Sequence, residues 1–113
     1  MVKGTFAYQD AYLKKFNKNY EKFKSLRSRI DKKCEQVLKD PYTGTEFLAD
    51  ATHGLNLKGC RSIRVDLNVR IIFVICEECR RIKDCAYCFC EGLPDKAVVF
   101  LTVNTHQRAY ELK

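Results

Sequence analysis

The residue types best suited to chemistry lie from His53 onwards. His53 and His106 are its two histidines, and imidazole can take up or release a proton near neutral pH. Arg70 opens an otherwise apolar stretch, so its guanidinium needs a partner such as Asp66 or a bound phosphate. Simpler interpretations also fit: His53 as a solvated loop residue, and Arg64 with Asp66 as an exposed ion pair. The set suits proton transfer beside a phosphate.

Five cysteines within fifteen positions form a second candidate site. They make two C-x2-C pairs five residues apart, with Cys90 left over. Four thiolates from two such pairs satisfy the tetrahedral coordination of a structural zinc ion, and the predicted ligands are Cys76, Cys79, Cys85 and Cys88. The short separation leaves disulfides or free thiols open as alternatives. Of the other two, Cys34 follows an apolar helical stripe as a core residue, and Cys60 is either a buried thiol or a reactive one.

The composition is that of one small domain without a membrane segment. At 113 residues the chain can bury one modest core. It has no apolar run near the roughly 18 to 20 residues of a membrane-spanning helix, and its N-terminal stretch lacks the apolar region of a secretory signal. We therefore expect a single cytoplasmic domain over residues 1–113 that does not contact a membrane, with reduced thiols that favour metal binding over disulfides.

The positive charge of the chain is concentrated in one segment. The formal net charge is +7, and residues 14 to 39 hold ten basic against three acidic residues, which accounts for the whole excess. Such a basic helical face attracts polyphosphate, suits an acidic protein partner, or is merely solvated. If the face binds RNA, the residues expected to carry the affinity are Lys15, Lys22 and Lys33.

The pattern of the first half predicts a short strand and then two helices that present this basic face. Asp10 has the side chain of an N-cap for the first helix, and Asn17 and Asn19 weaken helix continuity at its end. Apolar residues then recur at steps of three and four until Pro41 ends the pattern. The predicted elements are a strand at 4–9, helices at 11–19 and 20–38, and a loop at 41–54.

The second half changes from a helical period to a period of two. Ile63, Val65 and Leu67 alternate with polar residues, so they are expected on a buried face, with Ser62, Arg64 and Asp66 on the other face. The next apolar run follows too soon for a crossover, which predicts an antiparallel hairpin. The predicted strands cover residues 62–67, 69–75 and 96–103, and the predicted fold is α+β, with the helices on one face of an antiparallel sheet.

An ordered set of short motifs runs through the chain: "HGLNLKG" at 53–59, an arginine on the next strand, "VRIIF" at 69–73 and "NTHQRAY" at 104–110. With the strand and helical hairpin before it, this order resembles the RelE/ParE toxin superfamily, nearest the RelE and YafQ-like messenger RNA interferases. The resemblance excludes about residues 76–92, which we interpret as a Cys-rich insertion between the last two strands. It implies an endoribonuclease that cleaves messenger RNA on the ribosome without a metal, and an acidic antitoxin as its partner.

The resemblance also implies roles for individual residues. His53 matches a histidine that YafQ-like members carry before their Leu-Gly turn, and His106 matches the histidine of the terminal motif, so each is a candidate acid or base. Arg70 matches the phosphate clamp that opens a strand, and Tyr110 matches the terminal aromatic, which in some members stacks on or protonates the substrate. Arg64 stands on the concave face where YafQ-like members have a histidine, and a guanidinium cannot act as a base. The expected supporting phosphate contacts are Lys58 and Arg61.

The implied chemistry suits these residue types. Cleavage of RNA by its own 2′-hydroxyl needs a group to take that proton, positive charge for a phosphorane-like transition state, and an acid for the 5′ leaving oxygen. Two other functions stay open. One is a non-catalytic zinc-containing protein that binds nucleic acid or the ribosome; the other is a ParE-like inhibitor of DNA gyrase, which the pair of histidines disfavours.

Overall fold

The structure is a computed structural model that describes residues 6–48, 51–52, 55–56, 59–81 and 90–105. None of the helices in these ranges is long and apolar enough to cross a membrane. The elements follow in the order β1 (Gln9–Tyr12), α1 (Lys14–Lys22), the 3-10 helix η1 (Lys24–Leu26), α2 (Arg27–Lys39), β2 (Glu46–Leu48), β3 (Ala51–Thr52), β4 (Leu55–Asn56), β5 (Cys60–Arg64), β6 (Val69–Ile75), α3 (Cys76–Cys79) and β7 (Ala97–Thr105).

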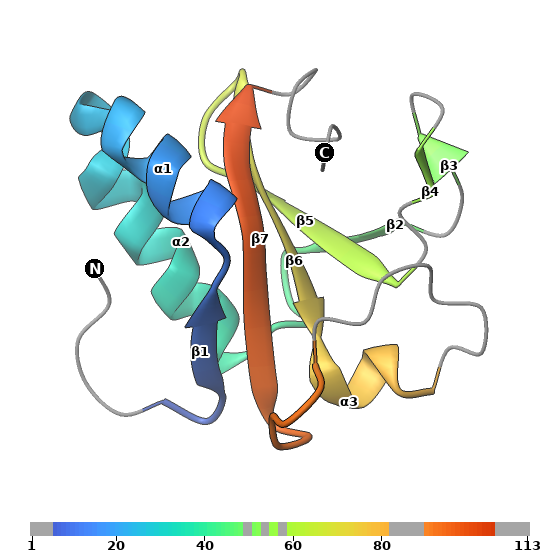
Figure 1. The fold of residues 1–113 in the computed structure, drawn as a ribbon. Helices are drawn as coiled ribbons and strands as arrows, with labels where there is room; N and C mark the ends of the chain where they lie inside the picture. The colour runs from blue at the N-terminus through green and yellow to red at the C-terminus, as the bar shows by residue number, and fades with distance from the viewer. Residues whose placement is uncertain (1–5, 49–50, 53–54, 57–58, 82–89, 106–113) are drawn as a thin grey trace.

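Five strands form one mixed sheet in the order β1-β7-β6-β5-β2, and β3 pairs with β4 in a small separate hairpin. The pairs β2·β5, β5·β6 and β6·β7 are antiparallel, whereas β1 runs parallel to β7. The predicted α+β class is confirmed, but the sheet is not purely antiparallel as expected. The first and last strands of the chain lie side by side because the two helices carry the chain away from β1 before the antiparallel strands return to it (Figure 1).

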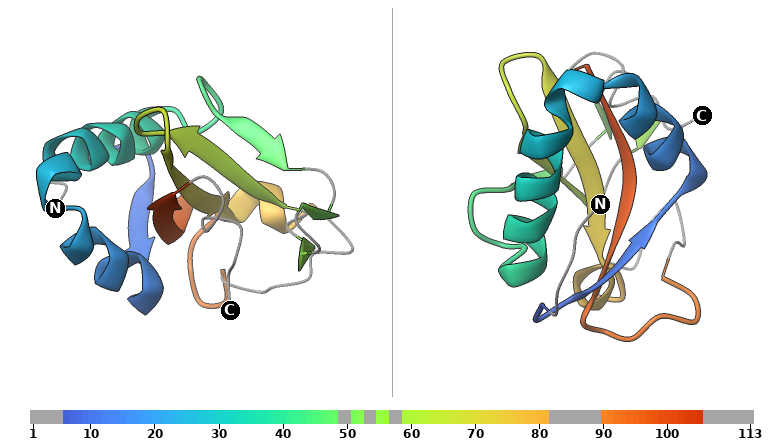
Figure 2. Two further views of the ribbon diagram at one scale, coloured as in Figure 1. Left: turned by 90° about the horizontal axis from the view of Figure 1, so that it is seen from above. Right: turned by 90° about the vertical axis from the view of Figure 1, so that its left-hand side faces the viewer.

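Alternate side chains of the central strand β6 enter two separate apolar clusters. Ile71 packs with Phe16 of α1 and Val37 of α2, and we call this side of the sheet the helical face. Ile72 points to the other side, which we call the cysteine face because its cluster contains Cys60, Cys76, Cys79 and Cys90. Both helices lie beside β1 and β7, away from β3 and β4 (Figures 1 and 2). A single core against the helices was predicted; the second cluster was not.

The predicted boundaries of the first strand and helix were wrong. β1 begins at Gln9 and includes Asp10, whose carboxylate accepts a hydrogen bond from the Tyr12 hydroxyl at 2.9 Å. Asp10 is therefore not a helix cap. The N-cap position of α1 is Leu13, which has no side-chain cap. The backbone of Asp10 pairs with Val98 of β7, so long-range strand pairing overrides the local capping preference.

Asn19 does not interrupt the first helix. Its side chain is 5% exposed and donates a hydrogen bond to the Thr102 hydroxyl of β7 at 3.0 Å. This contact satisfies the amide that would otherwise compete with helical hydrogen bonds. The last residue of α1 is instead Lys22, with Phe23 as the C-cap, and η1 then leads into α2. The residue that pattern analysis interpreted as a break thus fixes α1 against the sheet.

The predicted loop at 41–54 contains a strand. β2 pairs with β5, with Phe47 opposite Arg61, and forms the edge of the sheet. Of its three residues, Leu48 is buried and Glu46 and Phe47 are exposed. Such a short edge strand lacks the alternating pattern by which strands are recognised. Its position matters for function because β2 closes one side of the hairpin that carries the candidate arginines.

The turn between β5 and β6 exposes a residue that was predicted to be buried. The Asp66 carboxylate oxygen Oδ1 accepts hydrogen bonds from the backbone N–H groups of Asn68 and Val69 at 2.8 and 2.9 Å. This turn ends β5 at Arg64, and Leu67 at its tip is 85% exposed. The alternation also failed at Ser62, which is buried and not on an exposed face.

Candidate functional site

Arg64 and Arg70 lie opposite each other in the β5–β6 hairpin. Arg64 pairs with Arg70, and Arg70 pairs in turn with Asn104 of β7. Directly opposed residues of a ladder project from the same side of a sheet, so the three side chains form one row. Arg70 has the same parity as Ile72, which places the row on the cysteine face. We call Arg64, Arg70 and Asn104 the arginine row.

The arginine row carries positive charge that no carboxylate neutralises within the described ranges. Neither arginine forms an ion pair there. The Nε atom of Arg70 is buried without a hydrogen-bond partner, as is the hydroxyl of Ser62, which lies one row further along β5. An unpaired buried polar atom costs about 1–3 kcal/mol, and opposed like charges destabilise a sheet. An oxyanion such as a phosphate group would relieve both penalties.

The other residues predicted to take part in catalysis lie outside the described residues. These are His53, His106 and Tyr110, together with the predicted phosphate contact Lys58. Arg64 and Arg70 are thus the two predicted catalytic residues whose relation the structure describes. Asn104 was missed, although it directly precedes the "THQRAY" segment; its position opposite Arg70 is set by strand register, which one sequence does not reveal.

The three helical lysines predicted to bind RNA lie on two different helices. Lys33 of α2 lines a groove that Arg64 also lines. Lys15 is half-buried near the start of α1 and is engaged by another group, and Lys22 is exposed at the end of α1. Of the three predicted lysines, Lys33 therefore shares a groove with a member of the arginine row.

Arg61 does not join the arginine row. Its partner across the ladder is Phe73 of the helical face, so its side chain leaves the sheet on the side opposite Arg64. The guanidinium makes a two-pronged ion pair with Glu78, with Nε–Oε1 and Nη2–Oε2 distances of 2.9 and 2.8 Å. It also lies over the rings of Tyr42 and Phe47. Arg61 thus has the surroundings of a structural arginine rather than of the predicted phosphate contact.

The cysteines meet in a combination that spacing did not predict. Cys76 and Cys79 are buried on the single turn of α3, and the thiol of Cys90, predicted as the spare, contacts both of them. Burial, followed by contact with Cys76, raises the pKa of the Cys90 thiol. Cys85 and Cys88 lie outside the described residues, and no three His, Cys, Asp or Glu side chains within the described ranges form a set that could hold a metal ion. Cys34 and Cys60 are buried; Cys34 lies in the core as expected.

Glutamates attach α3 to the rest of the domain. The Glu77 carboxylate accepts hydrogen bonds from the hydroxyls of Tyr8 and Tyr42. The bond from Tyr8, followed by that from Tyr42, holds the pKa of Glu77 below its usual value. Glu78 holds Arg61, as described above. The "CEEC" turn therefore directs its thiols inward and its carboxylates to neighbouring elements, so the start of the predicted insertion is an integral part of the fold.

Comparison with known proteins finds a solved structure with a similar fold. No family model and no curated protein matches the chain. Among solved structures, the chain is similar to the toxin-antitoxin complex RelBE2 from Mycobacterium tuberculosis, with a TM-score of 0.59 and 15% sequence identity. The match covers 91% of this chain and 95% of the other. The chain therefore has a RelE-like fold, as the order of its motifs predicted.

Proposed function

We propose that this chain is the toxin of a toxin-antitoxin pair and that it cleaves messenger RNA on the ribosome. The observation that carries the proposal is the arginine row on a sheet of RelE-like fold. Two fixed guanidinium groups suit the doubly charged phosphorane that forms when a 2′-hydroxyl attacks its neighbouring phosphate. The similarity to a solved toxin-antitoxin complex supports the same class of function.

In the proposed reaction, Arg70 and Arg64 hold the non-bridging oxygens of the scissile phosphate. A base removes the proton of the 2′-hydroxyl, the 2′-oxygen forms a bond to phosphorus, and the bond from phosphorus to the 5′-oxygen breaks. An acid gives its proton to that leaving oxygen, so the products are a 2′,3′-cyclic phosphate and a 5′-hydroxyl. A guanidinium cannot act as a base, so the proposed proton transfers are assigned to His53, His106 and Tyr110.

The proposed protein partner is an acidic antitoxin. The similar solved structure is a complex of toxin and antitoxin, and this chain has an excess of seven positive charges. Opposite charge accelerates association and suppresses wrong partners. The ribosome and its message are the proposed targets for the same electrostatic reason, because phosphates attract the lysines and arginines that the antitoxin would cover.

We also propose a structural zinc ion bound by the Cys-rich segment and separate from catalysis. Cys76 and Cys79, the first C-x2-C pair, lie together on α3, and Cys90 is buried beside them. Because the described thiols alone form no metal-binding set, the proposed site also needs the second pair, Cys85 and Cys88. Thiolates are the preferred ligands of structural zinc sites. Metal analysis of cysteine variants would identify the remaining ligands among Cys85, Cys88 and Cys90.

The experiment that tests the catalytic proposal maps the ends of a message on programmed ribosomes after incubation with the purified chain. We expect cuts that leave 2′,3′-cyclic or 3′-phosphate ends. His53→Ala and His106→Ala should each slow cleavage by about 10²-fold or more if they transfer protons. Ribosome binding should change little in either variant, because the lysines of the basic helical face, which are expected to carry the affinity, are unchanged.

The other two functions give different outcomes in the same assay. A non-catalytic binding protein would associate with ribosomes and leave the message intact at every pH. A ParE-like protein would also leave the message intact but would block DNA supercoiling by gyrase.

Lys18→Ala serves as the matched control variant in the cleavage assay. Lys18 is an exposed cation of α1 away from the arginine row.

A further inference from the structure

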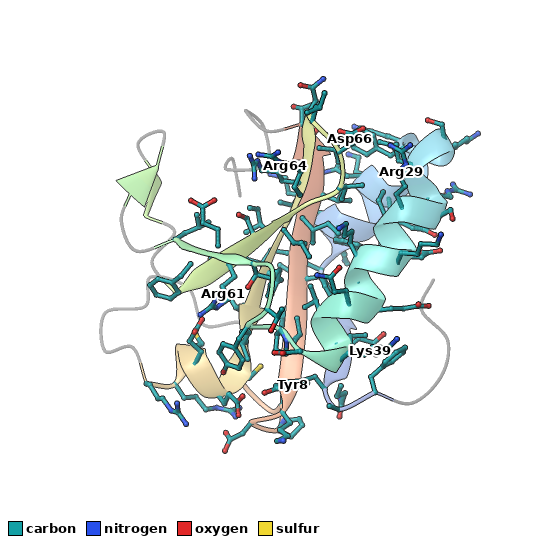
Figure 3. The ribbon with its side chains drawn as sticks, turned by 180° about the vertical axis from the view of Figure 1, so that it is seen from behind. Tyr8, Arg29, Lys39, Arg61, Arg64 and Asp66 are labelled. Carbon is teal, nitrogen blue, oxygen red and sulfur yellow. The ribbon has the colours of Figure 1, made fainter. Side chains whose placement is uncertain are left out.

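A groove of about 620 Å³ lies between α2 and the turn of the β5–β6 hairpin. One wall is a single helical face of α2, with Arg29, Lys32 and Lys33 at steps of three and four. The other wall is the end of the hairpin, including Arg64 and Leu67. In Figure 3, Arg29 and Asp66 lie close together at the top of the molecule, and Arg64 lies a short way along the hairpin.

The groove is strongly positive. Four of its lining residues are basic and one, Asp66, is acidic. Asp66 uses its Oδ1 atom to accept the two backbone hydrogen bonds that form the turn. Within the described part of the chain, no ion pair forms between Asp66 and the basic residues of the groove. Among the described residues, the groove therefore has no internal counter-charge beyond one carboxylate, which the turn already uses.

The groove also has apolar surface, which distinguishes a protein ligand from a nucleic acid. Leu67 is 85% exposed at the rim and Val65 lies beside it in the wall, while the lysine and arginine stems add methylene groups. Grooves for single-stranded nucleic acid combine positive charge with aromatic rings on which bases stack. Among the described residues, none that lines this groove is aromatic. The groove therefore suits a peptide that presents both carboxylate and aliphatic side chains.

We infer that this groove binds an acidic, aliphatic segment of a protein partner, with glutamates or aspartates facing Arg29, Lys32 and Lys33 and an apolar side chain covering Leu67. The inference rests on the proposed function, because the partner it describes is the antitoxin. It adds a mode of regulation. Arg64 lines the groove and also stands opposite Arg70 in the arginine row. A carboxylate drawn to Arg64 from the groove competes with the phosphate of the substrate, so the partner inhibits without filling the arginine row.

The test measures binding of the full-length chain to a short fluorescent peptide in which glutamates and leucines recur at helical spacing. Arg29→Gln with Lys32→Gln should weaken binding by about tenfold, as expected for two lost charge contacts. Leu67→Ser should weaken it by about threefold or more through lost apolar contact. Lys14→Gln with Lys18→Gln is the matched control: it removes the same charge from exposed positions of α1 and should leave the affinity within about twofold.

Two further probes separate the alternatives. A peptide with glutamine in place of glutamate should bind poorly, and an oligouridylate should bind with an affinity that Leu67→Ser does not change. The inference is wrong if the control pair weakens the acidic peptide as much as the groove pair, or if the groove pair weakens only the oligouridylate. Cleavage of messages is scored separately with the wild-type chain, so failure of peptide binding and failure of the nuclease proposal are independent results.

Discussion

The arginines near the two ends of the β5–β6 hairpin differ in whether they have carboxylate partners. At the end next to α3, Arg61 is paired with Glu78 and Arg80 with Asp95. At the turn end, Arg64 and Arg70 face each other, with no carboxylate partner in the described part of the chain. Figure 3 shows Arg61 low on the strand and Arg64 near the turn. Arginines a few residues apart in one sequence therefore divide into structural and functional candidates according to their partners.

The largest effect should come from Arg70→Ala. Loss of a guanidinium aimed at the phosphorane should slow cleavage by about 10²- to 10⁴-fold and relieve growth arrest on expression in a bacterium. The melting temperature should stay the same or rise, because the substitution removes one of two opposed like charges. Cleavage kinetics and thermal unfolding measure the two effects. If the Arg70→Ala variant is as toxic as the parent, Arg70 is not the phosphate clamp.

Removal of the proposed zinc should have the next largest effect and should act at the α3 end. We expect about one zinc per purified chain. Extraction with a chelator should lower the melting temperature markedly, because metal-binding free energy adds directly to folding free energy. Cys76→Ser, Cys79→Ser and Cys90→Ser, compared with Cys34→Ala as the control core thiol, identify ligands by lost metal. Absence of zinc, with a mass two protons lower per cysteine pair than that of the reduced chain, would indicate disulfides instead.

Arg61→Ala should destabilise the protein more than it slows cleavage. The side chains of Arg61 and Glu78 are 14% and 16% exposed, so the substitution leaves a largely buried carboxylate without its partner. The free energy of unfolding should fall by about 2–3 kcal/mol. Cleavage per folded molecule should fall far less than in Arg70→Ala. Chemical denaturation and single-turnover kinetics on the same preparations test this contrast, which would collapse if both arginines affected the rate equally.

The smallest effect should be the pH dependence of the Glu77 cluster. The pKa of Glu77 is held below its usual 4.5, so its contribution to stability is present above that value and is lost as the pH falls through the folded pKa. Burial, followed by contact with Glu77, raises the pKa of Tyr42 from 10.0 to about 12, so its contribution is present below pH 10.0 and lost as the pH rises toward 12. Glu77→Gln should flatten both limbs of a stability profile measured by denaturation. An unchanged acid limb would contradict the role given to Glu77.

Local pattern was enough for the central strands. The apolar run from Val69 to Ile75 was predicted with the bounds that β6 has, and the short link before it required the hairpin that aligns Arg64 with Arg70. The predictions of a helix cap at Asp10 and a weakened helix at Asn19 were wrong because both residues contact β7, which comes much later in the sequence. The pairing of Arg61 with Glu78 and the approach of Cys90 to Cys76 likewise depend on distant segments. One sequence contains the residues of these contacts but not their partners.

The parallel pairing of β1 with β7 has a consequence for when the sheet can form. Gln9 pairs with Ala97, so the sheet joins residues from nearly opposite ends of the chain. Asn104, the third member of the arginine row, also belongs to β7. While the chain is being synthesised, β7 leaves the exit tunnel after β1 and both helices. We expect the five-stranded sheet, and any activity that depends on it, to form only once β7 has emerged. An antitoxin already present could then bind the chain before the arginine row is complete.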